Sequence, residues 1–422
     1  MLQSMRIIGG QPLVGEIQIS GAKNLALPAI AASILTDETV TIDNMPNLAD
    51  TSFMQDIAMH FGSNIQRISN NAYEFTTKNI TTTIAPYDYV RKMRASILFL
   101  GSLLSRCGHA KISMPGGCAI GARAIDLHIY AMRKLGAHIE IENGYINAKA
   151  DKLIGSDIIF DHVTVGGTEN AILASVTARG TTRIINASKE PEVIALCKML
   201  NSMGGKIYHD NDSNTIIIDG VDKLHSTTFK IISDRIEAGT YAIAAAITKG
   251  KITLKDCVYD DLTLFFDCLK HAGIHISKND NSVTVEGCDV IKPHSVTTAP
   301  HPMFHTDLQA QYMALMTIAD GCSHITETVF ENRFMHVNEL NRMGANIVVQ
   351  HNTAIINGVR RLNGARVMAT DLRASVALVL AGLSADGETI VNRLYHIDRG
   401  YEDIDAKLSG CGAKLERVNV EQ

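Results

Sequence analysis

The strongest constraint on the fold is an internal repeat with a period near 70 residues. A pair made of a mostly apolar residue and a glycine occurs six times, and each pair precedes a segment in which apolar and polar residues alternate. The glycines lie 74, 68, 69, 71 and 68 residues apart, at Gly62, Gly136, Gly204, Gly273, Gly344 and Gly412. Glycine is typical of a helix C-terminus and alternation of a strand, so each repeat predicts a capped helix followed by strands.

A second set of strand-like segments lies between these, for example "RGTTRIINAS" and "DGETIVNRLY". Alanine-rich apolar segments precede them, such as "NLALPAIAASIL" and "LRASVALVLAGL". A helix that is apolar on all sides belongs in a core. The repeat therefore predicts the order β, buried α, β, loop, amphipathic α, β, β. Six such units in 422 residues predict an α/β protein of two domains, each with three units around three buried helices.

The domain boundaries follow from the phase of the repeat. The sequence begins and ends within a unit, so both termini are expected to complete the same domain. We expect an N-terminal domain at residues 22–232, which contains a cysteine loop, and a second domain at residues 1–21 and 233–422.

Charge and motif content exclude several classes of function. The formal net charge is -5 and no basic run occurs, which argues against nucleic acid or a membrane as a partner. The eight cysteines form no CxxC pair or Cys/His cluster, so no metal site is predicted. No HExxH, GxSxG or GxGxxG motif occurs, and no apolar run is long enough to span a bilayer. We expect a cytoplasmic protein.

The loop "MPGGCAIGAR" combines flexibility with a thiol. Three glycines surround Cys118, and Arg123 precedes an expected helix that begins near Ala124. A positive charge and a helix N-terminus both lower the pKa of a thiol. The pattern favours a mobile loop with a reactive cysteine about as much as a flexible loop whose cysteine is incidental.

Polar residues also gather where the apolar helices begin. Lys23 and Asn24 directly precede one of them, where an anion would meet free backbone N–H groups and an ammonium group; a solvated capping lysine is the alternative. Other charged groups lie at helix starts or in loops of equivalent units, and they predict a cleft for a multiply anionic substrate. These groups include Arg94, Arg123, Asp307, Arg333, Asp371, Arg373 and Arg399.

The motifs together resemble the enolpyruvyl transferase family. The resemblance runs from about Gly15 to Leu415 and rests on "SGAKN", "RKMRAS", "PGGCAIGAR", "SDRIEAGT", "TAPHP", "TDLQAQ", "ETVFENRFMHV", "ATDLRAS" and "YHIDRGYE". It implies two inside-out α/β domains of three βαβαββ repeats each. It also implies transfer of the enolpyruvyl group of phosphoenolpyruvate to the 3-hydroxyl of UDP-N-acetylglucosamine, with release of phosphate, as the committed step of peptidoglycan synthesis. No cofactor is implied.

Residue roles follow from the same resemblance. Cys118 is implied as a proton donor on a closing loop, and Asp307 as the general base for the sugar hydroxyl with Asp371 beside it. The implied contacts to phosphoenolpyruvate and neighbouring phosphate charge are Lys23, Asn24, Arg94, Arg123, Arg373 and Arg399. Lys23, Cys118, Asp307, Asp371 and Arg399 form the expected catalytic set.

A uridine and sugar pocket is also implied, and here the sequence departs from the common family pattern. Alanine at 124 replaces a frequent proline, histidine at 162 a frequent lysine, and threonine at 164 a frequent serine, which bears on affinity for the diphosphate. The expected pocket residues are Ala124, Ile125, Asp126, Leu127, His162, Val163, Thr164, Val165 and Val329, with Arg333 nearby.

Two alternatives remain open at this point. A 3-phosphoshikimate 1-carboxyvinyltransferase shares the implied fold and chemistry but lacks the cysteine loop. A non-catalytic paralogue that binds a nucleotide sugar would need none of the catalytic set.

Overall fold

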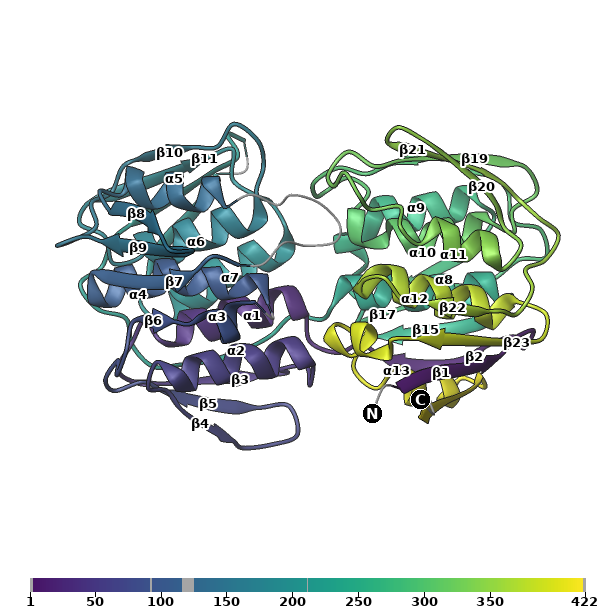
Figure 1. Ribbon diagram of the computed structural model, residues 1–422, viewed down its shortest axis with the longest axis horizontal. Helices are drawn as coiled ribbons and strands as arrows, with labels where there is room; N and C mark the ends of the chain where they lie inside the picture. The colour runs from purple at the N-terminus through teal and green to yellow at the C-terminus, as the bar shows by residue number, and fades with distance from the viewer. Residues whose placement is uncertain (1–2, 92, 116–124, 211, 420–422) are drawn as a thin grey trace. The chain divides into compact units, whose positions relative to one another are not determined.

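The computed structural model describes residues 3–91, 93–115, 125–210 and 212–419. These residues form two compact units (Figure 1). The host unit comprises residues 3–20 and 233–419, and the insert unit comprises residues 21–115 and 125–232. Each unit has its own hydrophobic core, with no buried apolar residue shared between the two clusters in the described chain.

The insert unit contains three four-stranded sheets, ordered β14-β3-β5-β4, β6-β7-β9-β8 and β10-β11-β13-β12. Its strands are β3 (Thr39–Asp43), β4 (Asn64–Arg67), β5 (Tyr73–Thr76), β6 (Ile84–Ala85), β7 (His109–Ser113), β8 (His138–Glu142), β9 (Tyr145–Lys149), β10 (Asp157–Ile159), β11 (Thr181–Ile185), β12 (Lys206–Asp210), β13 (Thr215–Asp219) and β14 (Thr227–Lys230). Its helices are α1 (Lys23–Ser33), α2 (Ala49–His60), α3 (Tyr87–Val90), the 3-10 helix η1 (Arg94–Leu98), α4 (Phe99–Cys107), α5 (Asp126–Lys134), α6 (Val165–Ser175) and α7 (Pro191–Ser202).

The host unit repeats this plan, with sheets ordered β16-β17-β15-β2, β18-β19-β21-β20 and β22-β23-β1-β24. Its strands are β1 (Gln3–Ile8), β2 (Val14–Gln18), β15 (Lys251–Lys255), β16 (His275–Asn279), β17 (Ser282–Glu286), β18 (Val296–Thr297), β19 (Cys322–Thr326), β20 (Asn346–Gln350), β21 (Thr353–Asn357), β22 (Arg366–Met368), β23 (Glu388–Asn392) and β24 (Lys414–Asn419). Its helices are α8 (Arg235–Ile247), η2 (Tyr259–Leu262), α9 (Thr263–His271), η3 (Thr306–Leu308), α10 (Gln309–Met316), α11 (Val337–Arg342), α12 (Leu372–Ser384), η4 (Leu394–Arg399) and α13 (Ile404–Gly410).

Every sheet has the same strand pattern. An edge strand runs parallel to the strand that follows the buried helix, as β10 does to β11, and two antiparallel strands complete the sheet. Three sheets take a strand from a distant part of the chain. β14 supplies the parallel edge beside β3, β2 supplies the parallel edge beside β15, and β1 lies between β23 and β24. The predicted α/β fold of βαβαββ repeats is confirmed.

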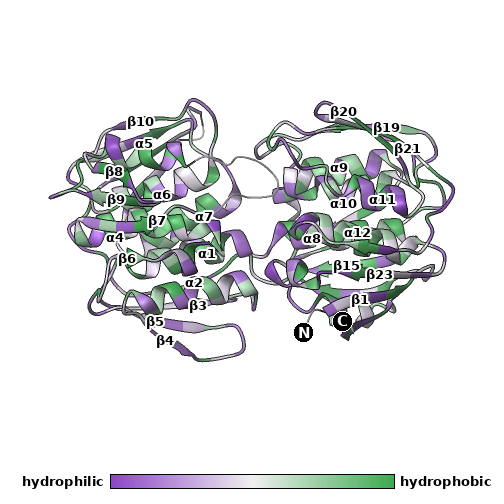
Figure 2. Ribbon diagram, viewed as in Figure 1, coloured by the Kyte–Doolittle hydropathy of each residue, from purple (hydrophilic) through white to green (hydrophobic). Residues whose placement is uncertain are grey.

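The inner helices are α1, α4 and α6 in the insert unit and α8, α10 and α12 in the host unit. Most of their residues are buried, and in Figure 2 apolar residues run along them at the centre of each unit. This all-round burial matches their composition, because small and aliphatic side chains allow a helix to be covered on every side.

The six repeat glycines share one conformation. Each lies just after an outer helix, α2, α5, α7, α9, α11 or α13, with φ between 91° and 107°. This left-handed region carries a steric cost for residues with a Cβ atom. The conformational demand explains why the glycine repeats even where the neighbouring sequence does not.

No helix in the described residues is long and apolar enough to cross a membrane. Among the same residues, no group of three or more His, Cys, Asp or Glu side chains is arranged to hold a metal ion.

Candidate active site

The N-terminal halves of the three inner helices meet in the host unit. The Gln311 side-chain amide of α10 donates to Thr240 Oγ1 of α8 at 3.1 Å and to the Tyr401 hydroxyl at 3.2 Å. Arg373 at the start of α12 donates to the same hydroxyl at 3.2 Å. Helix N-termini carry partial positive charge, so this end of the unit favours anions.

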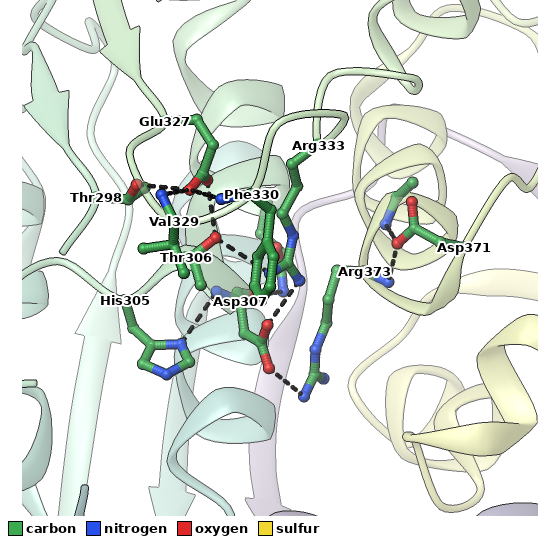
Figure 3. A network of polar contacts seen from close by, with 12 residues as sticks. Thr298, His305, Thr306, Asp307, Glu327, Val329, Phe330, Arg333, Asp371 and Arg373 are labelled. Atoms are coloured by element: carbon green, nitrogen blue, oxygen red, sulfur yellow. Dashed lines mark hydrogen bonds and ion pairs between the residues drawn. The ribbon is translucent and has the colours of Figure 1, made fainter. Parts of the chain in front are cut away.

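Asp307 lies in η3, immediately before α10, between two guanidinium groups (Figure 3). Arg333 Nη2 donates to Asp307 Oδ1 at 2.6 Å, and Arg373 Nη2 donates to Oδ2 at 3.1 Å. Both arginines are buried, whereas 18% of the Asp307 side chain is exposed. The sequence-predicted residues Asp307, Arg333 and Arg373 are therefore brought together, with part of the carboxylate accessible.

Charge sets the protonation of this cluster. Burial alone would raise the pKa of Asp307, but Arg373 and Arg333 hold it well below its usual range. Burial disfavours the charge on Arg373, yet Asp307 keeps the pKa of that guanidinium above its ordinary value. The group is an ionised carboxylate between two cations.

Burial also lowers the pKa of His305 well below its ordinary value, and nearby Arg235 acts in the same direction. The His305 ring is consistent with this because its Nδ1 accepts a hydrogen bond from the backbone N–H of Asp307 at 3.0 Å. A neutral imidazole can accept through one nitrogen, whereas an imidazolium cannot.

Glu327 follows β19 and fixes the loop that carries Val329. Its Oε1 accepts hydrogen bonds from Thr298 Oγ1 at 2.9 Å and from the backbone N–H of Val329 at 2.8 Å (Figure 3). Its Oε2 accepts from Thr306 Oγ1 at 2.8 Å. Val329, a predicted substrate contact, is thus tied to the segment that precedes Asp307.

Asp371 caps helix α12. Its Oδ1 accepts from the backbone N–H groups of Arg373 at 2.9 Å and Ala374 at 3.0 Å. Nearby His336 is fully buried, and neither ring nitrogen has a hydrogen-bond partner among the described residues. Burial lowers the pKa of His336 to about 4.

Arg399 ends the short helix η4, and Tyr401 follows it. Burial lowers the pKa of His396 in η4, and the charge of Arg399 acts in the same direction. η4 packs against α12 and therefore places Arg399 and His396 near that helix.

In the insert unit, Lys23 is the first residue of α1. It is 7% exposed, and its Nζ lies 2.7 Å from Asp50 Oδ2 of α2. The alternative of a solvated capping lysine is therefore wrong. The ammonium group is held inside the protein by a buried carboxylate.

Buried carboxylates also lie near the start of α6 and α7. Glu169, Glu190 and Glu192 are each almost fully buried. Burial raises the pKa of Glu169 well above its ordinary value, and the two other glutamates reinforce the shift. Arg94 at the start of η1 and Asn24 in α1 are half-buried.

The predicted nucleotide-sugar residues lie at the starts of α5 and α6. Thr164 caps α6 by accepting from the backbone N–H of Gly167 at 3.2 Å, and Val163 and Val165 flank it. His162 is exposed, and its Nδ1 lies 2.6 Å from Asp161 Oδ1. At the start of α5, Ile125 is buried, Leu127 is half-buried and Asp126 is exposed. Of the remaining predicted residues, Cys118, Arg123 and Ala124 lie outside the described residues.

Sequence reasoning missed the polar partners of these groups. Thr306, Glu327 and Tyr401 connect Asp307, Arg333 and Arg373, and Asp50 pairs with Lys23. All but Asp50 lie in or beside segments that the motifs already marked, "TDLQAQ", "ETVFENRFMHV" and "YHIDRGYE". A signal for Glu327 was its position, since it is a carboxylate directly after a strand.

Known proteins resemble this chain over its whole length. Residues 7–408 match the family described as EPSP synthase (3-phosphoshikimate 1-carboxyvinyltransferase). The UDP-N-acetylglucosamine 1-carboxyvinyltransferase of Magnetococcus marinus is 49% identical over 99% of this chain and 100% of its own, and that of Rickettsia bellii is 51% identical with the same coverage. The solved enolpyruvyl transferase NikO of Streptomyces tendae is 24% identical, covers both chains completely and superimposes with a TM-score of 0.90.

Proposed function

Because this chain belongs to the EPSP synthase family of enolpyruvyl transferases, we infer that it transfers the enolpyruvyl group of phosphoenolpyruvate to the 3-hydroxyl of UDP-N-acetylglucosamine and releases phosphate. The observation that carries this conclusion is an identity near one half, over the full length, to transferases of that name. The chain is thus a transferase of peptidoglycan and cell-wall biosynthesis. We expect it to act in the cytoplasm, without a nucleic-acid partner.

The reaction needs a base at the sugar and an acid at the vinyl group. The 3-hydroxyl oxygen attacks C2 of phosphoenolpyruvate as it loses its proton, while C3 gains a proton. Loss of a proton from C3 and of phosphate from C2 then restores the double bond. A positioned acid and base each lower such a barrier by stabilising the transferring proton.

Asp307 is suited to the base. Two of its lone-pair sites are occupied by Arg333 and Arg373, and a carboxylate has about four. Its exposed edge can therefore accept a hydrogen bond from the sugar hydroxyl. Because its pKa is low, it is ionised at neutral pH and takes the proton only as attack proceeds.

Cys118 is proposed as the acid on the strength of its loop motif. Lys23, Asn24, Arg94, Arg123, Arg373 and Arg399 are proposed to hold the phosphate and carboxylate of phosphoenolpyruvate or neighbouring phosphate charge, and Arg373 also donates to Asp307. Cationic groups of this kind also stabilise the phosphate as it departs.

The altered pocket positions bear on specificity. His162 stands where lysine is frequent in the family, and it pairs with Asp161. Any positive charge on His162 is then partly neutralised, so it would attract a diphosphate less than a lysine does. We propose weaker binding of UDP-N-acetylglucosamine at this contact, with the same chemistry.

The direct test measures phosphate release from phosphoenolpyruvate with UDP-N-acetylglucosamine and, separately, with shikimate 3-phosphate. Wild type is compared with Cys118→Ser, and Cys322→Ser serves as a control because Cys322 is exposed on β19. Release that needs the nucleotide sugar and Cys118, but not Cys322, supports the proposal. Release with shikimate 3-phosphate alone supports the EPSP synthase alternative, and no release from folded protein supports a binding paralogue.

A further inference from the structure

Glu327, the residue directly after β19, is a carboxylate whose two oxygens both accept hydrogen bonds. It is 3% exposed and accepts four hydrogen bonds, from Thr298, Thr306, Val329 and Phe330. Burying a carboxylate is costly unless its lone pairs are satisfied. The four donors fix the orientation of the Glu327 carboxylate, and the segments that carry those donors are held in place by it.

The Oε1 side of Glu327 shapes the loop at residues 327–330. The backbone N–H groups of Val329 and Phe330 donate to Oε1 at 2.8 and 3.2 Å. Thr298 donates its hydroxyl proton to the same oxygen and accepts from the backbone N–H of Thr328 at 3.0 Å. This side therefore fixes where Val329 is presented.

The Oε2 side leads to Asp307. Thr306 has one hydroxyl proton and gives it to Glu327, so its oxygen faces other donors as an acceptor. Arg333 Nη1 uses that acceptor at 3.1 Å, while Arg333 Nη2 holds Asp307 at 2.6 Å (Figure 3). A continuous series of hydrogen bonds therefore runs from Glu327 through Thr306 and Arg333 to Asp307. It sets the orientation of the Asp307 carboxylate.

We propose that Glu327 is a positioning residue that couples the loop recognising the nucleotide sugar to the orientation of Asp307. The inference rests on the proposed function, in which Val329 contacts UDP-N-acetylglucosamine and Asp307 receives the proton of its 3-hydroxyl. In this role Glu327 and Thr306 act through Val329 and Arg333, to which they are hydrogen-bonded.

Replacing Glu327 by glutamine should keep the hydrogen bonds made by Oε1 and remove the one that Oε2 accepts from Thr306. The amide oxygen takes the Oε1 place, since the opposite orientation would set an NH2 group against two backbone N–H donors. The amide nitrogen then faces Thr306 and can no longer accept its proton. Glu327→Gln should lower kcat about 10- to 100-fold through Asp307, with KM for UDP-N-acetylglucosamine within about threefold of wild type.

Variants of the two threonines test the sides one at a time. Thr306→Val should reproduce the loss of kcat, and Thr306→Ser should restore most of it because the hydroxyl returns. Thr298→Val should instead raise KM for UDP-N-acetylglucosamine about threefold to tenfold, with a smaller change in kcat. Glu331→Gln, at an exposed neighbouring position, is the matched control and should leave both constants unchanged.

The kinetic split distinguishes positioning from a purely structural role, which would lower stability and both constants together. The melting temperature of each variant is measured alongside. Equal effects of Thr298→Val and Thr306→Val on both constants, or no rescue by serine, would overturn the inference. An inactive wild type would overturn the proposed function itself, a result that the variants cannot mimic.

Discussion

Asp307 illustrates how strongly a residue's neighbours determine its chemistry. This carboxylate, which we propose as the general base, is also the counter-charge that allows two guanidinium groups to be buried. Removing one partner of a buried ion pair leaves an uncompensated charge. If the proposed role is correct, a change at Asp307 should therefore affect both activity and stability.

Asp307→Asn should reduce kcat strongly and lower the free energy of unfolding by about 3 kcal/mol, because Arg333 and Arg373 lose their common counter-charge. Phosphate release and urea unfolding measure the two effects. Asp386→Asn removes an exposed partner of Arg361 and should cost less than about 1 kcal/mol. Equal losses of stability in both variants would show that the Asp307 cluster contributes no more than a surface pair.

His336 makes stability depend on pH. Burial lowers its pKa from 6.5 to about 4, with Arg333 acting in the same direction and Asp371 opposing. Between these values the unfolded chain binds a proton that the folded protein does not. The contribution of neutral His336 is therefore fully present above pH 6.5 and is lost as the pH falls toward 4, by on the order of 3 kcal/mol.

His336→Phe should flatten this dependence, because phenylalanine fills the space without titrating. The free energy of urea unfolding at pH 7, 5.5 and 4.5 measures the effect, with His324→Phe on the exposed side of β19 as control. Asp307 contributes a separate loss only below its ordinary pKa, since its folded pKa is depressed. Parallel pH curves for wild type and His336→Phe would contradict the assignment.

At this scale, sequence patterns find charged residues but not their partners. Lys23 and Asp307 stand out because each begins an apolar helix. The pairing of Lys23 with Asp50, and the link from Thr306 through Arg333, depend on how distant segments pack. The spacing of neighbouring residues in the sequence therefore does not predict these contacts.

Among the elements, α4 shows a feature that local propensity cannot predict. The segment begins as the 3-10 helix η1 and becomes α-helical at Phe99. The fully buried Asn170 of α6 donates to the Ile97 carbonyl at 3.0 Å and accepts from the Gly101 N–H at 2.8 Å. Asn170 thus binds a backbone carbonyl and a backbone N–H on either side of the point where the 3-10 helix becomes α-helical.

Asn170→Ala should destabilise the insert unit by about 2–5 kcal/mol, because two buried backbone groups lose a partner. Urea unfolding monitored by circular dichroism measures this. Asn64→Ala, at an exposed position in β4, should change stability by less than about 0.5 kcal/mol. A loss no larger than that of the control would mean that the backbone groups find new partners.

The repeated elements themselves could be predicted, and for a physical reason. Each outer helix ends at a glycine with positive φ, and each inner helix is apolar all round. Both requirements are local, so they leave a pattern in the sequence. The contact that Asn170 makes with α4 joins it to Gly101, 69 residues away, and such a distant contact leaves no local pattern.

In the whole molecule, each unit buries its own core. The three sheets of the insert unit use only strands β3 to β14, and its apolar cluster lies within residues 22–231. The host unit in contrast needs β1 and β2 as well as residues 233–419. One continuous segment of the chain therefore contains every strand of the insert unit, whereas the host unit needs two separate segments.

Residues 21–232 expressed alone should fold cooperatively, because they retain a complete core, whereas residues 233–422 alone should not, because β1 is an internal strand of its sheet. Joining residues 1–20 to 233–422 by a short glycine linker should restore folding, since the Ser20 carbonyl already accepts from the Asp234 N–H at 2.8 Å. Circular dichroism and urea unfolding of the three fragments test this. A cooperative transition in residues 233–422 alone would contradict it.

The pairing of β1 with β23 and β24 also has a consequence for how the chain is made. A ribosome adds about 5–20 residues per second, so β1 emerges on the order of 20 to 80 s before β23 does. During that interval the insert unit can be completed, while β1 stays without its native neighbours. Unpaired strand edges are prone to aggregate. The nascent protein is thus most in need of a chaperone at its first strand, until its last repeat has been translated.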